Sequence, residues 1–208
     1  MEGTHETEVA ADILSEFLEV AIHSVLYCRG VYPQGVFGRK KKYNVPVQVC
    51  LHPDVSQYVS SVSRSVRCLL VQGAVSRVDV VLTSPDTHPL ERFVFDIGTT
   101  AAEIGSSVRD DEYLLHLEQS LRALLLKLNV SDSLLHPLPP DCSWTIHVHT
   151  KESAAAALGE QLTTRDFPWV EAEESEQQLS DPHLIPLKSL KSHLFKIQLY
   201  AEESGKKT

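Results

Sequence analysis

The sequence is poor in cysteine, with four such residues among 208, and they lie far apart. No CxxC pair is present, which excludes zinc-knuckle and thioredoxin-like motifs. A chain of this length buries enough surface to fold without a disulfide or a structural metal. We therefore predict reduced thiols, typical of a cytosolic or nuclear protein, at Cys28, Cys50, Cys68 and Cys142.

Long apolar runs and an excess of positive charge are also lacking. No apolar run approaches the roughly 20 residues that a membrane span requires. The first ten residues, MEGTHETEVA, lack the basic and apolar regions of a signal peptide. The formal net charge is −9, the wrong sign for a protein that binds phosphates over its whole surface. We expect no membrane partner and no direct binding of nucleic acid.

Signatures of catalysis are missing as well. The chain contains no GxGxxG, GxxxxGK(S/T), GxSxG or HExxH motif. His147 and His149 share one face of a predicted strand, but no Cys, Asp or Glu at ligand spacing joins them, so solvent-facing histidines are favoured over a metal site. A Ser-His-Asp or Cys-His site assembled at long range stays open. The prediction is a protein without catalytic activity, cofactor or metal.

Three segments carry apolar residues at helical spacing. The first runs from about Thr7, a candidate N-cap, to Arg29, and its wide apolar stripe predicts a central helix. The second begins at Pro53 and ends at Gly73. The third follows a possible cap at Ser107. The apolar faces comprise Ile13, Leu14, Phe17, Leu18, Ala21, Ile22, Val25 and Leu26; Val55, Tyr58, Val59, Val62, Val66, Leu69 and Leu70; and Leu114, Leu117, Leu121, Leu124, Leu125 and Leu128.

Strands are predicted where apolar residues alternate with polar ones. Residues 76–83 and 90–97 flank turn-forming residues 84–89 and form an antiparallel hairpin, and 144–148 and 193–200 are further strands. Residues 151–190 show no clear pattern. Because helices and strands do not alternate in a βαβ order, the fold class is α+β, with helices packed on a mainly antiparallel sheet.

Three features outside these elements have two interpretations each. The basic run 39–42 predicts a solvated loop, or else a nuclear-localisation or phosphate-contacting patch. Trp169 lies in an acidic, irregular stretch, where it either anchors a long loop or forms the wall of a peptide pocket. Tyr58 lies on an apolar helix face, where burial is the default, although a tyrosine at the rim of a core can also contact a ligand.

Eight blocks of sequence resemble the HORMA-domain family, in particular its branch of accessory subunits of DNA polymerase zeta. They occur in one order from about residue 9 to 203, and so cover nearly the whole chain. The blocks are Phe17–Ala21, Tyr32-Pro33, Lys41–Gln48, Glu91–Phe95, Val148–Thr150, Asp166–Trp169, Leu184–Lys188 and Gln198–Tyr200.

The resemblance implies a single HORMA domain over residues 1–208, with three helices against the sheet and a C-terminal safety belt. The implied core spans about 8–150, and the belt and C-terminal strands span about 151–201. As a chain terminus, the tail 202–208 is predicted to be disordered. Such a belt wraps around an extended partner peptide that pairs with a sheet edge.

The resemblance also implies partners and sites. Tyr58 and Trp169 match positions that bind a peptide of the polymerase catalytic subunit. Leu184, Gln198 and Tyr200 match a second surface, which binds the C-terminal domain of the deoxycytidyl-transferase scaffold polymerase. The protein would then bridge two polymerases in translesion synthesis.

Further implied partners are a second HORMA domain, contacted through Arg122, and an AAA+ ATPase that remodels the belt. The expected location is the nucleus, and also the cytoplasm. Segments 98–109 and 152–165 depart from the family pattern. The alternatives are a spindle-checkpoint HORMA regulator of the anaphase-promoting complex and a small hydrolase.

Overall fold

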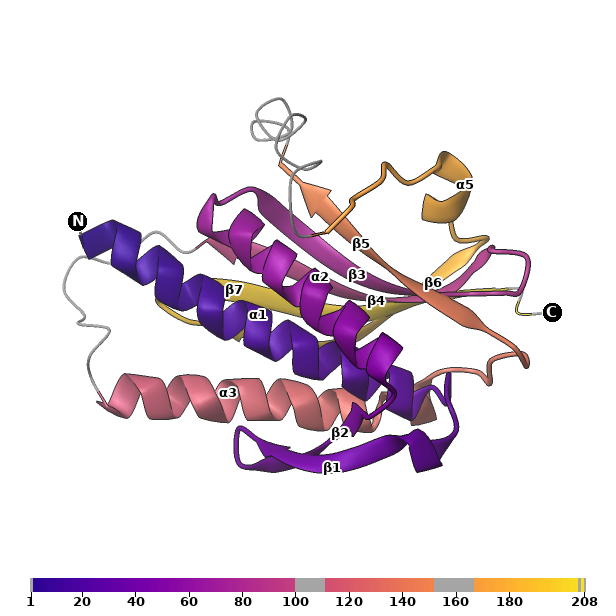
Figure 1. Ribbon diagram of the computed structural model, residues 1–208, viewed down its shortest axis with the longest axis horizontal. Coiled ribbons are helices and arrows are strands. Elements are labelled where there is room, and N and C mark those ends of the chain that lie inside the picture. Colours follow the sequence, from indigo (N-terminus) through magenta and orange to yellow (C-terminus); the bar gives the residue numbers. More distant parts are fainter. Residues whose placement is uncertain (1, 100–110, 152–166, 206, 208) are drawn as a thin grey trace.

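The computed structural model describes residues 2–99, 111–151, 167–205 and 207. In these residues, a layer of helices covers one face of a sheet, and a two-stranded hairpin lies beside the helices (Figure 1). The long helices are α1 (Glu2–Cys28), α2 (Pro53–Val71) and α3 (Asp111–Asn129). The strands are β1 (Phe37–Lys42), β2 (Val45–Cys50), β3 (Val75–Thr83), β4 (Pro89–Thr99), β5 (Ser143–Thr150), β6 (Pro182–Lys191) and β7 (Phe195–Ser204). Short helical turns are η1 (Gln34–Val36), η2 (Ser131–Leu134) and α5 (Glu174–Gln177).

The large sheet has the strand order β5-β3-β4-β7-β6, and every neighbouring pair is antiparallel. The predicted β3–β4 hairpin is present, with Val78 opposite Phe95. The sheet and its covering helices confirm the predicted α+β class. Because β5 and β6 occupy opposite edges, the chain between them passes from one edge of the sheet to the other.

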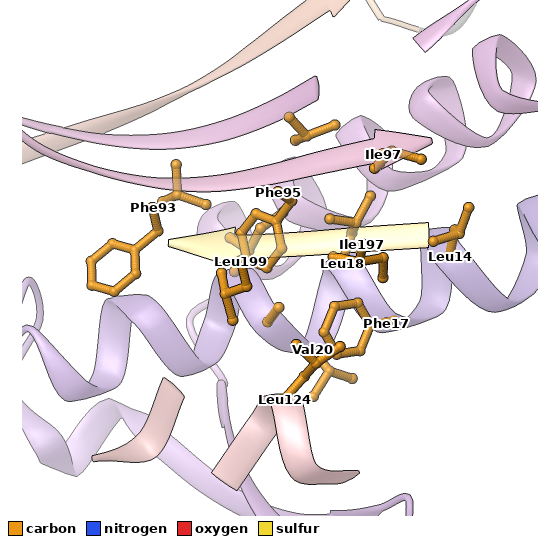
Figure 2. Close-up of a cluster of buried hydrophobic side chains, with 14 of the residues drawn as sticks. Leu14, Phe17, Leu18, Val20, Phe93, Phe95, Ile97, Leu124, Ile197 and Leu199 are labelled. Atoms are coloured by element: carbon orange, nitrogen blue, oxygen red, sulfur yellow. The ribbon is translucent and has the colours of Figure 1, made fainter. Parts of the chain in front are cut away.

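The core lies between α1 and the sheet (Figure 2). Phe17 of α1 meets Phe95 of β4 edge-to-face, with ring centroids 6.2 Å apart. Along β4 and β7, alternate residues are buried against the helices, and Phe95 pairs directly with Leu199. Helix α1 contacts α2 on one side and α3 on the other, as its wide apolar stripe predicts.

Two details of the helices differ from the prediction. Helix α1 begins at Glu2, so Thr7 lies inside the helix and does not cap it. Leu114, predicted to face inward, is exposed, because α3 turns the side of Leu117 and Leu121 toward the core. The possible cap at Ser107 lies outside the described residues.

The basic run is not a loop. Residues 39–42 belong to β1, which pairs with β2 from Phe37 opposite Cys50 to Lys42 opposite Val45. Tyr43 and Asn44 connect the strands with φ values of 46° and 58°. Two successive left-handed residues match the right-handed twist of a tight hairpin. The turn depends on the backbone conformation of these two residues, which composition does not show. The composition of the basic run alone therefore predicted a loop.

The C-terminal part also contains more structure than predicted. Residues up to Leu190 were expected to be irregular, whereas β6 begins at Pro182 and pairs with β7 along its length. The tail expected to be disordered from residue 202 continues β7 through Ser204, and Lys207 contacts buried carboxylates. The prediction failed because β6 has two prolines and little alternation, and because Glu203 is a buried charge.

The segments that depart from the family pattern, 98–109 and 152–165, lie almost entirely outside the described residues. Among the helices that the structure does describe, none combines the length and apolar character needed to cross a bilayer.

Candidate functional site

Among the described strands, β5 forms an edge of the large sheet, which we call the open edge. It pairs with β3 on one side, and no described strand pairs with its other side. Its residues, SWTIHVHT, include neither proline nor lysine. The opposite edge strand β6 carries Pro182, Pro186, Lys188 and Lys191 and a register shift, which are the usual means of blocking further pairing. The open edge of β5 is therefore suited to accept an additional strand.

Residues 167–181, which we call the belt segment, run beside this open edge (Figure 1). A groove of about 420 Å³ separates them from β5. Its apolar wall includes Leu69 of α2 and Ile146 and Val148 of β5, and Trp169 contributes from the belt segment. The remaining lining residues are His147, His149, Thr150, Val170, Glu171, Ala172 and Gln177. The groove thus follows the strand edge, where an extended chain could reach the free backbone groups of β5.

An aromatic cluster fixes the beginning of the belt segment. The indole Nε1 of Trp169 donates a hydrogen bond of 2.7 Å to Ser65 Oγ on α2. The Trp169 ring lies 4.6 Å from that of Phe167, centroid to centroid. Phe167 in turn meets Tyr58 at 5.6 Å, and Tyr58 meets Trp144 edge-to-face at 5.3 Å. Because these contacts are with α2 and β5, they hold the belt segment to the core next to the groove.

Of the two predicted peptide-binding residues, Trp169 and Tyr58, the structure places only Trp169 in the groove lining. Trp169 lines the groove and is also a loop anchor, so its two interpretations are compatible. Tyr58 does not line the groove; it supports Phe167 from behind, and burial raises the pKa of its hydroxyl. Phe167 is the residue that sequence reasoning missed, although an aromatic residue two positions before Trp169 was a visible signal.

On the face of the sheet away from the helices, His149 belongs to a network of charges around Asp79, and His147 is the cross-strand neighbour of Asp79. His149 Nε2 lies 3.0 Å from Asp79 Oδ2, and Arg77 Nε lies 2.6 Å from Asp79 Oδ1. Burial alone would raise the pKa of Asp79, but these two partners lower it. Burial lowers the pKa of His147, against the opposing charges of Asp79 and Glu176. No cluster of three potential metal ligands occurs in the described part of the chain.

The belt segment is acidic and contains a short helical turn, α5, that its own residues stabilise. Its turn α5 begins with a capping box between Glu173 and Glu176. Gln177 of α5 lines the groove together with His147, which faces the outer side of β5, whereas Trp169 contacts α2 on the helix side. The belt segment therefore crosses the β5 edge from one face of the sheet to the other.

The residues predicted for a second surface do lie together. In β7, Ile197, Leu199 and Ala201 are buried against the helices, so Gln198 and Tyr200 face the other way. Leu184 of β6 pairs with Glu202, which shares that outer face, and Leu184 is 53% exposed. The three predicted residues thus share the outer face of the β6–β7 hairpin, away from the helix layer.

Arg122 lies on the exposed side of α3. The exposed Leu115 and Leu126 stand seven residues before it and four after it, so the three residues share one helix face. This face combines a cation with exposed apolar side chains, as interfaces between proteins often do. It is built on a different element from both the groove and the β6–β7 surface.

Comparison with known proteins agrees with this architecture. The HORMA domain family model matches residues 10–167. The chain is 45% identical to the mitotic spindle assembly checkpoint protein MAD2B of Gallus gallus, over 96% of this chain and 93% of the relative. It is 34% identical to the DNA polymerase zeta processivity subunit of Arabidopsis thaliana, over 91% and 83%. A chain in the crystal structure of the mitotic checkpoint complex superimposes with a TM-score of 0.79 at 21% identity, over 95% of this chain and 96% of that one.

The chain belongs to the HORMA-domain family. The fold that the resemblance implied, helices packed on an antiparallel sheet, is confirmed. Within the family, the chain is a homologue of the MAD2B proteins and of the non-catalytic processivity subunit of DNA polymerase zeta. The prediction of an accessory subunit of that polymerase is therefore supported at the level of homology.

Proposed function

We propose that this protein captures an extended segment of the catalytic subunit of DNA polymerase zeta between the open edge of β5 and the belt segment. The observation that carries the proposal is the coincidence of an unprotected strand edge with an apolar groove directly beside it. The free N–H and C=O groups of β5 supply main-chain hydrogen bonds, and the apolar wall selects apolar and proline side chains.

The outer face of the β6–β7 hairpin serves a second partner in this proposal. Leu184, Gln198 and Tyr200 form a surface for the C-terminal domain of the deoxycytidyl-transferase scaffold polymerase. Because this surface lies on the far side of the sheet from the anchor of Trp169, both partners can bind at once. The protein then bridges an inserting and an extending polymerase, which places it in the nucleus.

Two further contacts complete the proposal. The α3 face around Arg122 joins a second HORMA domain, and an AAA+ ATPase releases the belt segment. If the α3 face is used, Arg122→Glu should raise the dissociation constant of self-association by about tenfold in sedimentation equilibrium, as for an interface arginine.

The central experiment measures binding of overlapping fluorescein-labelled peptides from the zeta catalytic subunit. Strand addition predicts that a binding peptide pairs with β5 through alternate residues. N-methylation of the amides that face β5 should abolish binding, whereas N-methylation at the intervening positions should leave it nearly unchanged. Equal effects at both sets of positions would rule out strand addition.

Co-purification from cells separates this function from the alternative. We expect the polymerase catalytic subunit as the dominant partner. Recovery of the anaphase-promoting complex in its place would favour the checkpoint role instead.

A further inference from the structure

A pair of buried carboxylates faces each other at the end of the sheet near the end of α1. Glu91 of β4 and Glu203 of β7 are direct partners in the antiparallel register. Their side chains are 0% and 4% exposed. Two neighbouring carboxylates removed from water repel each other and lose their hydration, so the fold must supply positive charge at this point.

Arg29, near the end of α1, supplies one of the two cations. Its Nη2 and Nε lie 2.6 Å and 2.9 Å from the two carboxylate oxygens of Glu91, which is a bidentate pair. It also contacts Asp132 and donates a 2.7 Å hydrogen bond to the carbonyl of His136. Arg29 therefore serves Glu91 and leaves Glu203 to other partners.

Lys207 supplies the second cation, and it contacts both carboxylates. Its Nζ pairs with Glu91 and with Glu203, and its side chain is 8% exposed. His136 adds a backbone hydrogen bond of 2.7 Å to Glu203. Burial alone would raise the pKa of Glu203, but the hydrogen bonds from Lys207 and His136 lower it to about 2. Lys207 is thus the shared counter-ion of two residues that would otherwise repel each other.

This charge cluster adjoins the point where the belt segment ends. Pro182, the first residue of β6, pairs with Ser204, next to Glu203. Gly205 N donates to the carbonyls of Ser180 and Asp181, both at 3.1 Å, and Ser204 Oγ donates to Ser180 at 2.9 Å. A Cβ on Gly205 would lie 3.0 Å from Asp181 Oδ2, so the two segments are in close contact. The end of the belt segment is therefore bound by Ser204 and Gly205, which lie between Glu203 and Lys207 in the chain.

The β6–β7 hairpin, which follows the belt segment, joins the other described strands of the sheet through the pairing of β7 with β4. In the described part of the chain, β7 pairs with β4 and with β6, and β6 has no other strand neighbour. From these contacts we infer that Glu203 and Lys207 are positioning residues, a C-terminal charge latch that holds the far end of the belt segment against the core. The latch rests on the proposed function in one respect: by keeping the belt segment in place, it lengthens the residence time of a captured peptide.

The test uses the full-length chain with Lys207→Met and the double variant Glu203→Gln/Lys207→Met. Lys196→Met is the matched control, because Lys196 is an exposed lysine on β7, the strand that contains Glu203. The first measurement is backbone hydrogen exchange without any peptide. Lys207→Met should speed exchange in β6 and β7 by about tenfold or more, because two neighbouring buried carboxylates that have lost their shared counter-ion favour local opening.

The double variant and the control make this result specific. Removing the second carboxylate should return much of the protection lost in Lys207→Met, since the repulsion is then gone. Lys196→Met should exchange like the wild type, and α1 should keep its protection in all variants. Unchanged exchange in β6 and β7, or an equal acceleration in α1 and β7, would overturn the latch.

The second measurement is the release rate of a fluorescein-labelled peptide of the zeta catalytic subunit that the wild type has captured. Lys207→Met should release it about tenfold faster, in proportion to the increased opening. An unchanged release rate despite faster exchange would refute control of residence time. A wild type that captures no peptide would refute the proposed function, and the exchange measurement would still decide the latch.

Discussion

Replacing Trp169 tests how the belt segment is attached beside the groove. Its indole contributes two separable interactions: ring contact with Phe167, and the 2.7 Å hydrogen bond to Ser65. Loss of a neutral hydrogen bond of this kind costs about 1 kcal/mol, or roughly fivefold in Kd. Truncation to alanine removes the ring as well, and for a hot-spot aromatic it should cost at least about 2 kcal/mol, or roughly 30-fold.

Isothermal titration calorimetry with a peptide of the zeta catalytic subunit measures these differences. Trp169→Ala should weaken capture most, while Trp169→Phe and Ser65→Ala should each produce the smaller, similar loss expected for the hydrogen bond alone. The thermal unfolding of each variant shows whether the fold is intact. An unchanged Kd for a folded Trp169→Ala variant would refute a role of Trp169 in peptide capture.

Three further predictions concern other parts of the molecule. Tyr200→Ala should weaken binding of the scaffold-polymerase domain and spare peptide capture in pull-downs; equal loss of both would indicate misfolding. Burial and the charge of Lys40 lower the pKa of His23 from 6.5 to about 4. Between pH 6.5 and about pH 4, the unfolded chain therefore takes up a proton at His23 that the folded chain does not. The unfolding free energy should fall by about 3 kcal/mol as the pH drops through this range. His23→Gln should remove this component in urea titrations at pH 7 and pH 4.5, and an identical pH dependence would contradict it. Leu124→Ala should cost about 2–5 kcal/mol of unfolding free energy, whereas Leu126→Ala, an exposed site on the same helix, should cost under about 0.5 kcal/mol.

The secondary structure of the core was largely readable from local patterns. The apolar stripe of α1 and the alternation of β4 and β7 state directly which face of each element is buried, because side-chain direction follows the backbone period. The same reasoning failed for β1, whose exposed basic residues carry no alternation, and for β6, an edge strand with two prolines. In both strands, pairing with a neighbouring strand decides the conformation. The pattern of side chains along one segment does not show which strand it pairs with.

For the candidate site, the sequence singled out Trp169, which lines the groove, but not Phe167 or the arrangement of the cluster. Trp169 stood out as an aromatic residue in an acidic stretch, and the resemblance associated it with Tyr58. The structure shows that both residues contact Phe167, and that Trp169 reaches Ser65, 104 positions away in the chain. Such contacts depend on how β5 and α2 pack, which no local window of sequence contains.

By itself, the amino-acid sequence determined the α+β class, the three core helices, the central hairpin and the family. These follow from periodic burial and from ordered blocks of residues, which are local properties of the chain. Only the tertiary structure decided that β5 lies at a sheet edge with no second partner among the described strands, that the belt segment crosses this edge, and that Glu91 and Glu203 face each other with Lys207 between them. Those features arise from strand order and register, because antiparallel pairing brings together groups that are more than a hundred residues apart.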